Sequence, residues 1–209
     1  MENQSLYQRV LGERYQQLHP LLREFHGRSE VRAEGTFRII RPPQLFKRLL
    51  GSLLGMPAAA ENVPTILTVA TIKNAEKWVR SFGKFRMATW QWSWQHLLLE
   101  RSGPVTFGIH LEIVDGGMHF VCKRVWLLGI PLPLWIAPSV LAVVTPLQHG
   151  WHAKVQLMFP LIGEMLRYEG EIYPQLKNPP RQLGALRGSV LSISPDFDAP
   201  IDDFQDYRN

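Results

Sequence analysis

The residues that could carry acid–base or metal chemistry are spread along the whole chain. None of the histidines falls in an HExxH motif or in a Cys/His spacing typical of zinc sites. The histidines are His19, His26, His96, His110, His119, His149 and His152. A predicted hairpin would bring His110, Glu112 and His119 onto one sheet face. Two imidazoles and a carboxylate can bind a transition metal. Because such residues are mostly exposed, we interpret them instead as an outward polar face and predict no metal site.

Other reactive groups are few. The single cysteine, Cys122, lies on a predicted apolar face and is interpreted as an inert packed thiol. Charged residues beside predicted strands, at Glu100-Arg101 and at Trp78-Val79-Arg80, are typical of a sheet edge. No nucleophile elbow, phosphate loop or GxGxxG turn occurs, so we predict no catalytic residue and no cofactor.

Aromatic and apolar residues are the better candidates for a binding site. Trp90, Trp92 and Trp94 recur at period two in a predicted strand, on one face with His96 and Leu98. Such a stripe indicates either a stacking platform for a ring-bearing ligand or a part of the core.

A second apolar candidate is the uncharged stretch Val125–Val144. Its length is that of a transmembrane helix, but Gly129, Pro131, Pro133 and Pro138 argue against a continuous helix. We predict a strand end, an irregular apolar loop and a new strand, and no transmembrane segment. The loop is expected to pack on the domain, line a pocket mouth, dip into a membrane surface or dock a partner. The predicted ligand-binding residues are Trp90, Trp92, Trp94, Trp126, Leu128, Ile130, Leu132 and Trp135.

Residues 43–55 have the pattern of a basic amphipathic helix. Leucines repeat at the helical spacing, Pro43 suits the first turn and Gly55 the end. The helix either caps the sheet with its apolar stripe buried, or acts as a membrane-surface helix or lid. The residues of the second alternative are Leu45, Phe46, Lys47, Arg48, Leu49 and Leu53.

The remaining elements predict the fold. Helical spacing is found over 4–18 and again from Pro20 to a stop at Gly27, and residues 30–40 alternate as a strand with one wet face. Asp115-Gly116 predicts a hairpin pairing Ile113 with Met118, although a Gly116-Gly117 loop would match the faces as well. We expect an α+β fold: a strongly curved, barrel-like antiparallel sheet of about 8–9 strands, covered by the N-terminal helices and the amphipathic helix.

Composition sets the limits on domains, partners and location. Apolar residues make up 45% of the 209 residues and charged residues 20%, which fits one globular domain, expected over 1–178. Residues 179–209 are predicted to be a Pro/Asp-rich extension, and its last fifteen or so residues are expected to be loose. The net charge is +5, but the bases form no run and no nucleic-acid motif accompanies them, so nucleic acid is not expected. A lone cysteine and a polar N-terminus predict a cytoplasmic protein, with contact at the inner membrane face as a further option.

The order of several short motifs resembles the bacterial domain-of-unknown-function family 4166. The most specific is Leu128-Gly129-Ile130-Pro131-Leu132-Pro133 followed by Ala137-Pro138, and the resemblance covers about residues 5–173. Further motifs include Phe25-His26-Gly27, Glu76-x-Trp78-x-Arg80-x-Phe82-Gly83, Asp115-Gly116-Gly117 and Pro160-Leu161-Ile162-Gly163. The family has no established activity, but similar domains occur fused to oxidoreductases, which implies an accessory or ligand-holding role. Val143-Val144 stands here where an acidic residue would be expected.

Three functions follow as hypotheses. The first is a binding or accessory domain that holds a hydrophobic or amphipathic small molecule, or a lipid, in a cavity of the curved sheet. The alternative is a module that docks an oxidoreductase partner through the LGIPLP loop. The second alternative is a small enzyme that uses Glu112, His110 and His119, or Glu100 and Arg101.

Overall fold

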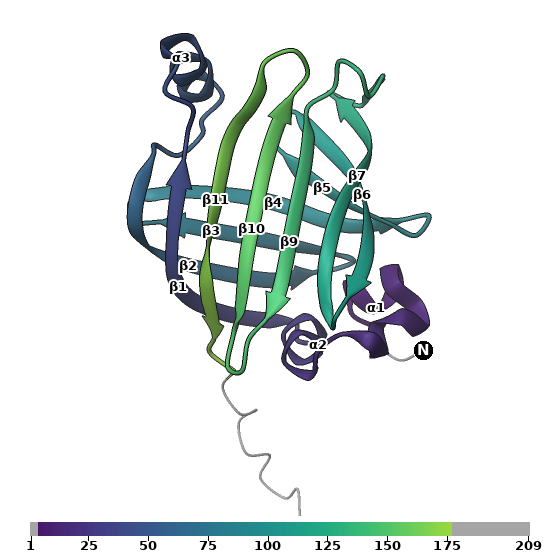
Figure 1. Cartoon of the computed structure of the whole chain (residues 1–209). Helices are drawn as coiled ribbons and strands as arrows, with labels where there is room; N and C mark the ends of the chain where they lie inside the picture. The colour runs from purple at the N-terminus through teal and green to yellow at the C-terminus, as the bar shows by residue number, and fades with distance from the viewer. Residues whose placement is uncertain (1–3, 177–209) are drawn as a thin grey trace, which may run out of the picture. The chain divides into compact units, whose positions relative to one another are not determined.

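A computed structural model describes residues 4–176 of the chain (Figure 1). The predicted Pro/Asp-rich extension over 179–209, with its last fifteen or so residues expected to be loose, lies outside the described residues.

The described residues form a closed antiparallel β-barrel (Figure 1). Ten strands form the ring in the order β6-β5-β4-β3-β2-β1-β11-β10-β9-β7, and β7 pairs back with β6 to close it. The short β8 attaches to the end of β7. The strands are β1 (Glu30–Ile40), β2 (Ala60–Ile72), β3 (Ala75–Phe82), β4 (Phe85–Trp94), β5 (Leu97–Ser102), β6 (Val105–Val114), β7 (Gly117–Leu127), β8 (Ile130–Leu132), β9 (Ser139–Pro146), β10 (Trp151–Phe159) and β11 (Gly163–Pro174). The expected α+β, barrel-like class is confirmed, with slightly more strands than predicted.

The extra strand comes from the run 85–100, which is not one strand but two. The chain reverses at Gln95 and His96, both with positive φ, so that Ser93 faces Leu98 across the β4–β5 pair. The prediction that Leu98 shares a face with the tryptophans is therefore wrong. The turn lacks the glycine or asparagine that usually supplies positive φ, and this is why the sequence did not reveal it.

The β6–β7 hairpin follows its sequence signal. Val114 pairs with Gly117, so Asp115-Gly116 is the two-residue loop, and both loop residues have positive φ as a type I′ turn requires. Ile113 faces Met118 as predicted.

The backbones of β1 and β11 approach each other closely at two glycines. These are Gly35 and Gly170, and a Cβ atom on either glycine would collide with the backbone of the other strand, at Glu171 and at Thr36. These two glycines therefore let the strands approach closely, as sharply coiled sheets require.

One end of the barrel is closed by the N-terminal helices. α1 (Leu6–Leu11) begins at a capping box between Ser5 and Gln8, a 3₁₀ turn spans Gly12–Gln17, and α2 (Pro20–Gly27) begins with proline and ends at the predicted glycine. Their apolar side chains are almost wholly buried, and the backbone N–H of His19 donates to Gly116 O at the β6–β7 turn, 2.8 Å away. The helices thus form a plug fixed to the barrel.

α3 (Leu45–Leu53) lies at the other end of the barrel (Figure 1). Of the two alternatives for this helix, burial of the apolar stripe against the sheet is wrong, because the stripe is exposed, with Leu53 84% accessible. A role as membrane-surface helix or lid stays a prediction. The face that packs contains Gly51, which lies against the Arg41 guanidinium, and Arg41 donates to the backbone oxygen of Arg48 at 2.7 Å. The helix is therefore held through its backbone, with its leucines facing outward.

The uncharged stretch 125–144 forms the end of β7, an apolar connection that includes β8, and the start of β9, as predicted. Within residues 4–176, no helix is long and apolar enough to cross a membrane.

Candidate functional site

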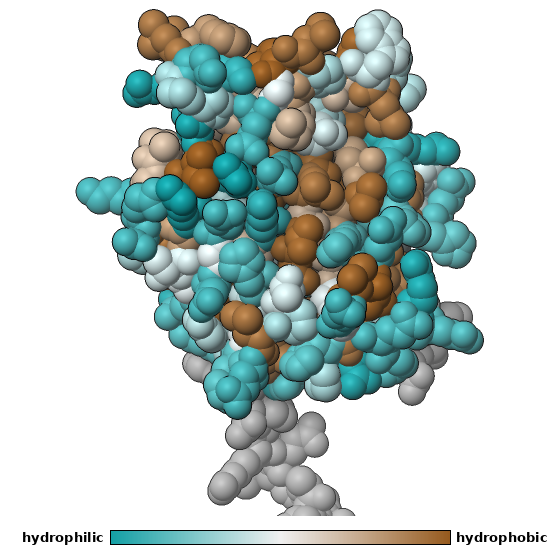
Figure 2. Space-filling model, viewed as in Figure 1, coloured by the Kyte–Doolittle hydropathy of each residue, from teal (hydrophilic) through white to brown (hydrophobic). Residues whose placement is uncertain are grey.

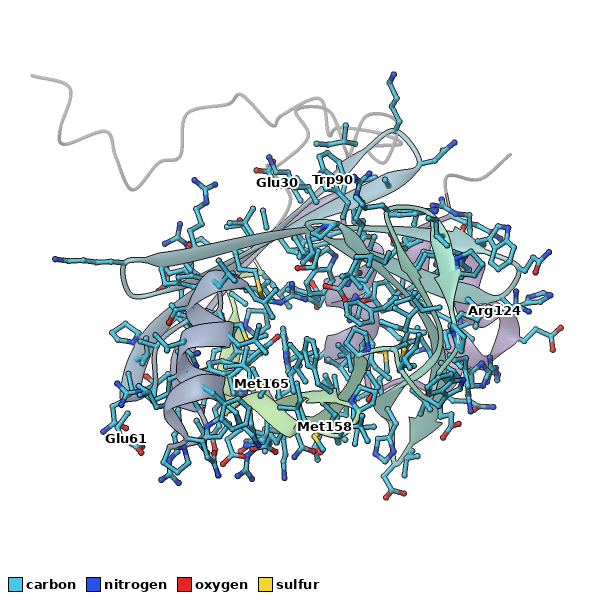
Figure 3. All side chains as sticks on the ribbon, turned by 90° about the horizontal axis from the view of Figure 1, so that it is seen from above. Glu30, Glu61, Trp90, Arg124, Met158 and Met165 are labelled. Atoms are coloured by element: carbon cyan, nitrogen blue, oxygen red, sulfur yellow. The ribbon has the colours of Figure 1, made fainter. Side chains whose placement is uncertain are left out.

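The barrel encloses a cavity of about 330 Å³. This volume lies at the lower end of the range for small-molecule sites. Figure 3 looks along the barrel and shows side chains from the strands surrounding its interior. Most of the lining is apolar, from nearly every strand; examples are Phe37, Leu67, Phe107, Phe120, Val155 and Leu166.

The plug supplies the floor of the cavity. Tyr7 from α1 and Phe25 and His26 from α2 line it, and the three rings pack on Trp78 of β3, with the Tyr7 and His26 ring centroids 3.7 Å apart. At the α3 end the lining includes Leu54. The cavity therefore runs from the helical plug to the end that carries α3.

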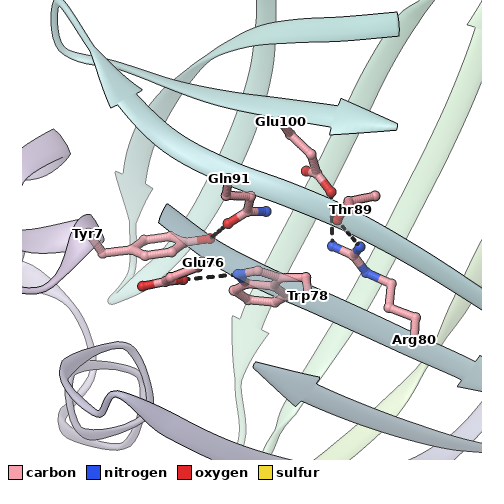
Figure 4. A network of polar contacts seen from close by, with 7 residues as sticks. All are labelled: Tyr7, Glu76, Trp78, Arg80, Thr89, Gln91 and Glu100. Atoms are coloured by element: carbon pink, nitrogen blue, oxygen red, sulfur yellow. Dashed lines mark hydrogen bonds and ion pairs between the residues drawn. The ribbon is translucent and has the colours of Figure 1, made fainter. Parts of the chain in front are cut away.

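A polar cluster lies on the wall formed by β3, β4 and β5 (Figure 4). The Tyr7 hydroxyl donates to Gln91 Oε1 at 3.1 Å, and Trp78 Nε1 donates to Glu76 Oε2 at 2.9 Å. Burial raises the pKa of Tyr7 well above its ordinary value, and burial likewise raises the pKa of Glu76 against the opposing hydrogen bond from Trp78. The Tyr7–Gln91 hydrogen bond thus joins α1 of the plug to β4 of the wall.

Arg80 is the cation of this cluster. Its guanidinium donates to Thr89 Oγ1 at 2.9 Å and forms an ion pair with Glu100 at 3.2 Å, and both charged side chains are only 16% exposed. Burial has the largest single effect and lowers the pKa of Arg80, but Glu100, Tyr168 and Tyr7 together outweigh it, and the pKa is raised. Arg80 therefore remains cationic, and its charge is balanced by Glu100.

Two further polar side chains face the cavity without a partner among residues 4–176. Neither the ring nitrogens of His26 nor the Tyr168 hydroxyl makes a hydrogen bond there, although both residues line the cavity. Burial lowers the pKa of His26 to about 3, and burial raises the pKa of Tyr168. Both are therefore neutral near pH 7, and each can donate or accept a hydrogen bond.

The predicted ligand-binding residues are located elsewhere. None of the eight lines the cavity, because β4 turns its tryptophans outward and its polar residues Thr89 and Gln91 inward. Trp90 and Arg124 lie on the outer surface of the barrel (Figure 3). Arg124 lies over the ring of Trp94, which in turn contacts Trp126 edge-on at 5.9 Å between centroids. Ligand binding by these eight residues stays a prediction.

The residues considered from the sequence as metal ligands or catalytic groups lie partly on the outer face of the barrel and partly in the cavity. Glu112 faces His119 across the β6–β7 pair, but the pair lies on the outer face, and no group of three metal-ligating side chains occurs within residues 4–176. Glu100 faces the cavity, whereas Arg101 is exposed. Arg80 and Glu100, interpreted from the sequence as charges at a sheet edge, are instead internal, so that interpretation is wrong.

Fold and site together describe a helix-plugged, ten-stranded antiparallel barrel with a mainly apolar internal cavity, whose polar groups are the β3–β5 wall and the separate side chains of His26 and Tyr168. The family model "Domain of unknown function (DUF4166)" matches residues 18–172, and the chain belongs to this family. The resemblance stated from the sequence motifs is thereby confirmed. No curated protein and no solved structure matches the chain.

Proposed function

We propose that this domain binds a small, neutral, largely apolar molecule inside the barrel and hydrogen-bonds its polar group through His26 of α2 or Tyr168 of β11. The supporting observation is the pair of polar side chains, His26 and Tyr168, that face the cavity without a hydrogen-bond partner among the described residues. Both residues line the cavity, so a ligand hydroxyl or carbonyl bound there can form a hydrogen bond with either of them.

The charge balance favours a neutral ligand over an anion. Arg80 is the cation of the polar wall, and Glu100 already neutralises it at 3.2 Å. An added carboxylate would be desolvated beside Glu100 without a free cation to offset the cost. A neutral alcohol or ketone avoids that penalty.

The first experiment is native mass spectrometry of the purified full chain, before and after mild denaturation. A bound mass of a few hundred daltons that is released on denaturation would support the proposal. Its class is then tested by displacing 1-aminoanthracene with a long-chain alcohol and with the carboxylate of equal chain length. We expect the alcohol to compete at least about tenfold better; equal or stronger competition by the carboxylate would contradict a neutral ligand.

A matched pair of variants tests whether the probe sits in the barrel. Ala153 lines the cavity on β10, so Ala153→Phe should fill it and reduce binding of 1-aminoanthracene by at least about tenfold. Ala88 lies on the exposed face of β4, and Ala88→Phe adds the same ring outside. Equal binding by both variants would place the probe elsewhere and overturn the proposal.

A further inference from the structure

Three segments at the α3 end of the barrel expose apolar side chains to solvent. They are α3 with Leu54, the β7–β9 connection (residues 128–138) and the β10–β11 turn (residues 160–162), and we call them together the rim. Figure 2 shows hydrophobic residues along this upper edge of the molecule. The largest exposures are those of Leu53 at 84%, Leu128 at 77% and Trp135 at 76%, and Leu161 is fully exposed.

The rim surrounds the end of the cavity. The three segments contribute to its lining or border residues that do: Leu54 lies at the end of α3, Pro138 closes the β7–β9 connection, and Phe159 immediately precedes the β10–β11 turn. The same segments therefore present apolar groups outward to solvent and inward to the cavity. A molecule that enters at this end passes the rim.

Two features indicate that the exposure is not incidental. α3 is held with its glycine face inward and its leucines outward, the reverse of the usual orientation of an amphipathic helix. Leu161 sits at the tip of the β10–β11 turn with φ +63°, a conformation that disfavours a branched apolar residue. Both positions place leucine in water at some cost, so the rim is expected to have an apolar partner.

The charged residues of the rim indicate what kind of apolar partner it binds. Its charged residues are Lys47 and Arg48, both basic, and the three segments contain no acidic residue. The Lys47 ammonium lies beside Gly163, next to the β10–β11 turn. Leucines, a tryptophan and bases without acids match the interfacial region of an anionic bilayer, where apolar groups insert and bases attract the headgroups.

We propose that the rim docks the barrel on the surface of an anionic lipid membrane, with the cavity facing the bilayer. The docking depends on the rim alone and not on a bound ligand. It extends the proposed binding function by naming the phase from which an apolar molecule would enter.

The test is co-sedimentation of the full chain with vesicles of phosphatidylcholine alone and with phosphatidylglycerol added. We expect binding to the mixed vesicles, weakened by salt because the headgroup attraction is screened. Lys47→Gln combined with Arg48→Gln should weaken it about thirtyfold, since each base near an anionic surface contributes about 1 kcal/mol. Leu53→Asp should weaken it at least tenfold.

The control is Ile72→Asp, which removes an exposed apolar residue (45%) at the end of β2. It lies next to the β2–β3 turn, where Asn74 O accepts a hydrogen bond from Arg9 of the plug. This variant should bind vesicles as the wild type does. Thermal unfolding of every variant checks that the barrel is intact. Ala153→Phe should still bind vesicles, so that a failure of the ligand proposal and a failure of docking are distinguishable.

Three outcomes would overturn the proposal. They are a wild-type chain that stays in the supernatant with all vesicles, a Leu53→Asp variant that binds unchanged, and an equal loss in Ile72→Asp. A wild type that ignores vesicles but dimerises in native mass spectrometry would assign the rim to a second copy. A wild-type chain that does not bind vesicles but binds an oxidoreductase would assign the rim to a protein partner.

Discussion

The two ends of the barrel use amphipathic helices in opposite ways. At the plug, Tyr7, Leu22 and Phe25 are almost completely buried against the strands and the cavity. At the rim, α3 also has an apolar stripe, yet its leucines face solvent and its backbone is held by Arg41. The comparison shows that an apolar stripe marks a surface that requires a partner, and that the partner need not be the domain itself.

The largest test of this comparison removes one apolar side chain from each end. Phe25→Ala should lower the free energy of unfolding by about 3–5 kcal/mol, because it leaves a void among packed rings. Leu53→Ala removes a side chain that contacts mostly water, and should change that free energy by less than about 0.5 kcal/mol. Urea unfolding measures both. A loss above about 2 kcal/mol in Leu53→Ala would mean that the rim is structurally packed.

The pH dependence of stability should also come from the plug. Burial lowers the pKa of His26 to about 3 in the folded state, against about 6.5 when unfolded. The unfolded state therefore binds the extra proton first, and stability is lost as pH falls below about 6.5, by about 2 kcal/mol at pH 5. The raised pKa of Glu76 acts in the opposite sense, since its folded state takes up a proton more readily.

His26→Phe should flatten this profile, and urea unfolding between pH 7.5 and 5 would show it. His149→Phe, which changes an exposed histidine, should keep the wild-type slope. If both variants lose stability with acid as the wild type does, His26 is not the sensing group.

Helix capping should distinguish the ends more weakly. Ser5 accepts the Gln8 N–H in the capping box of α1, so Ser5→Ala should cost about 1 kcal/mol of global stability. Gln44, at the N-cap of α3, makes no side-chain capping bond, and Gln44→Ala should change thermal unfolding very little. Similar costs for both substitutions would mean that α3 unfolds together with the barrel.

The smallest expected effect is a gain. Leu161→Asn places a residue that tolerates positive φ at the β10–β11 turn, and should raise the free energy of unfolding by up to about 1 kcal/mol. The same change should weaken vesicle binding. A rim residue that improves stability when replaced would show that its leucine is kept for contact rather than for folding.

The elements that the sequence predicted correctly are those with local signals. The alternation of residues 30–40, the Asp115-Gly116 loop and the stop at Gly27 each depend on neighbouring residues alone. The polar wall depends on long-range pairing: Arg80 meets Glu100 only because β4 lies between β3 and β5. The sequence did contain a signal for the polar wall, since Met87, Thr89 and Gln91 alternate with the tryptophans. That alternation does not show which face of the strand points into the barrel.

The orientation of α3 was equally hidden from the sequence. Its helical spacing predicts two apolar rows but not the element against which they pack. The deciding contact, Gly51 against the Arg41 guanidinium, brings together positions ten residues apart through the turn into the helix. Gly51 was nevertheless a sequence signal for the packed face of α3, because a residue without a side chain permits close packing on its own side of the helix.

Closure of the barrel also affects how the protein behaves at high concentration. An open sheet with an apolar surface risks strand addition from a neighbouring molecule, because unpaired N–H and C=O groups act as a template. Here the β6–β7 pairing joins the two ends of the ladder, and the terminal strand is the three-residue β8, whose central Pro131 has no N–H to donate. The rim can therefore remain apolar with little risk of fibril-like assembly through backbone pairing.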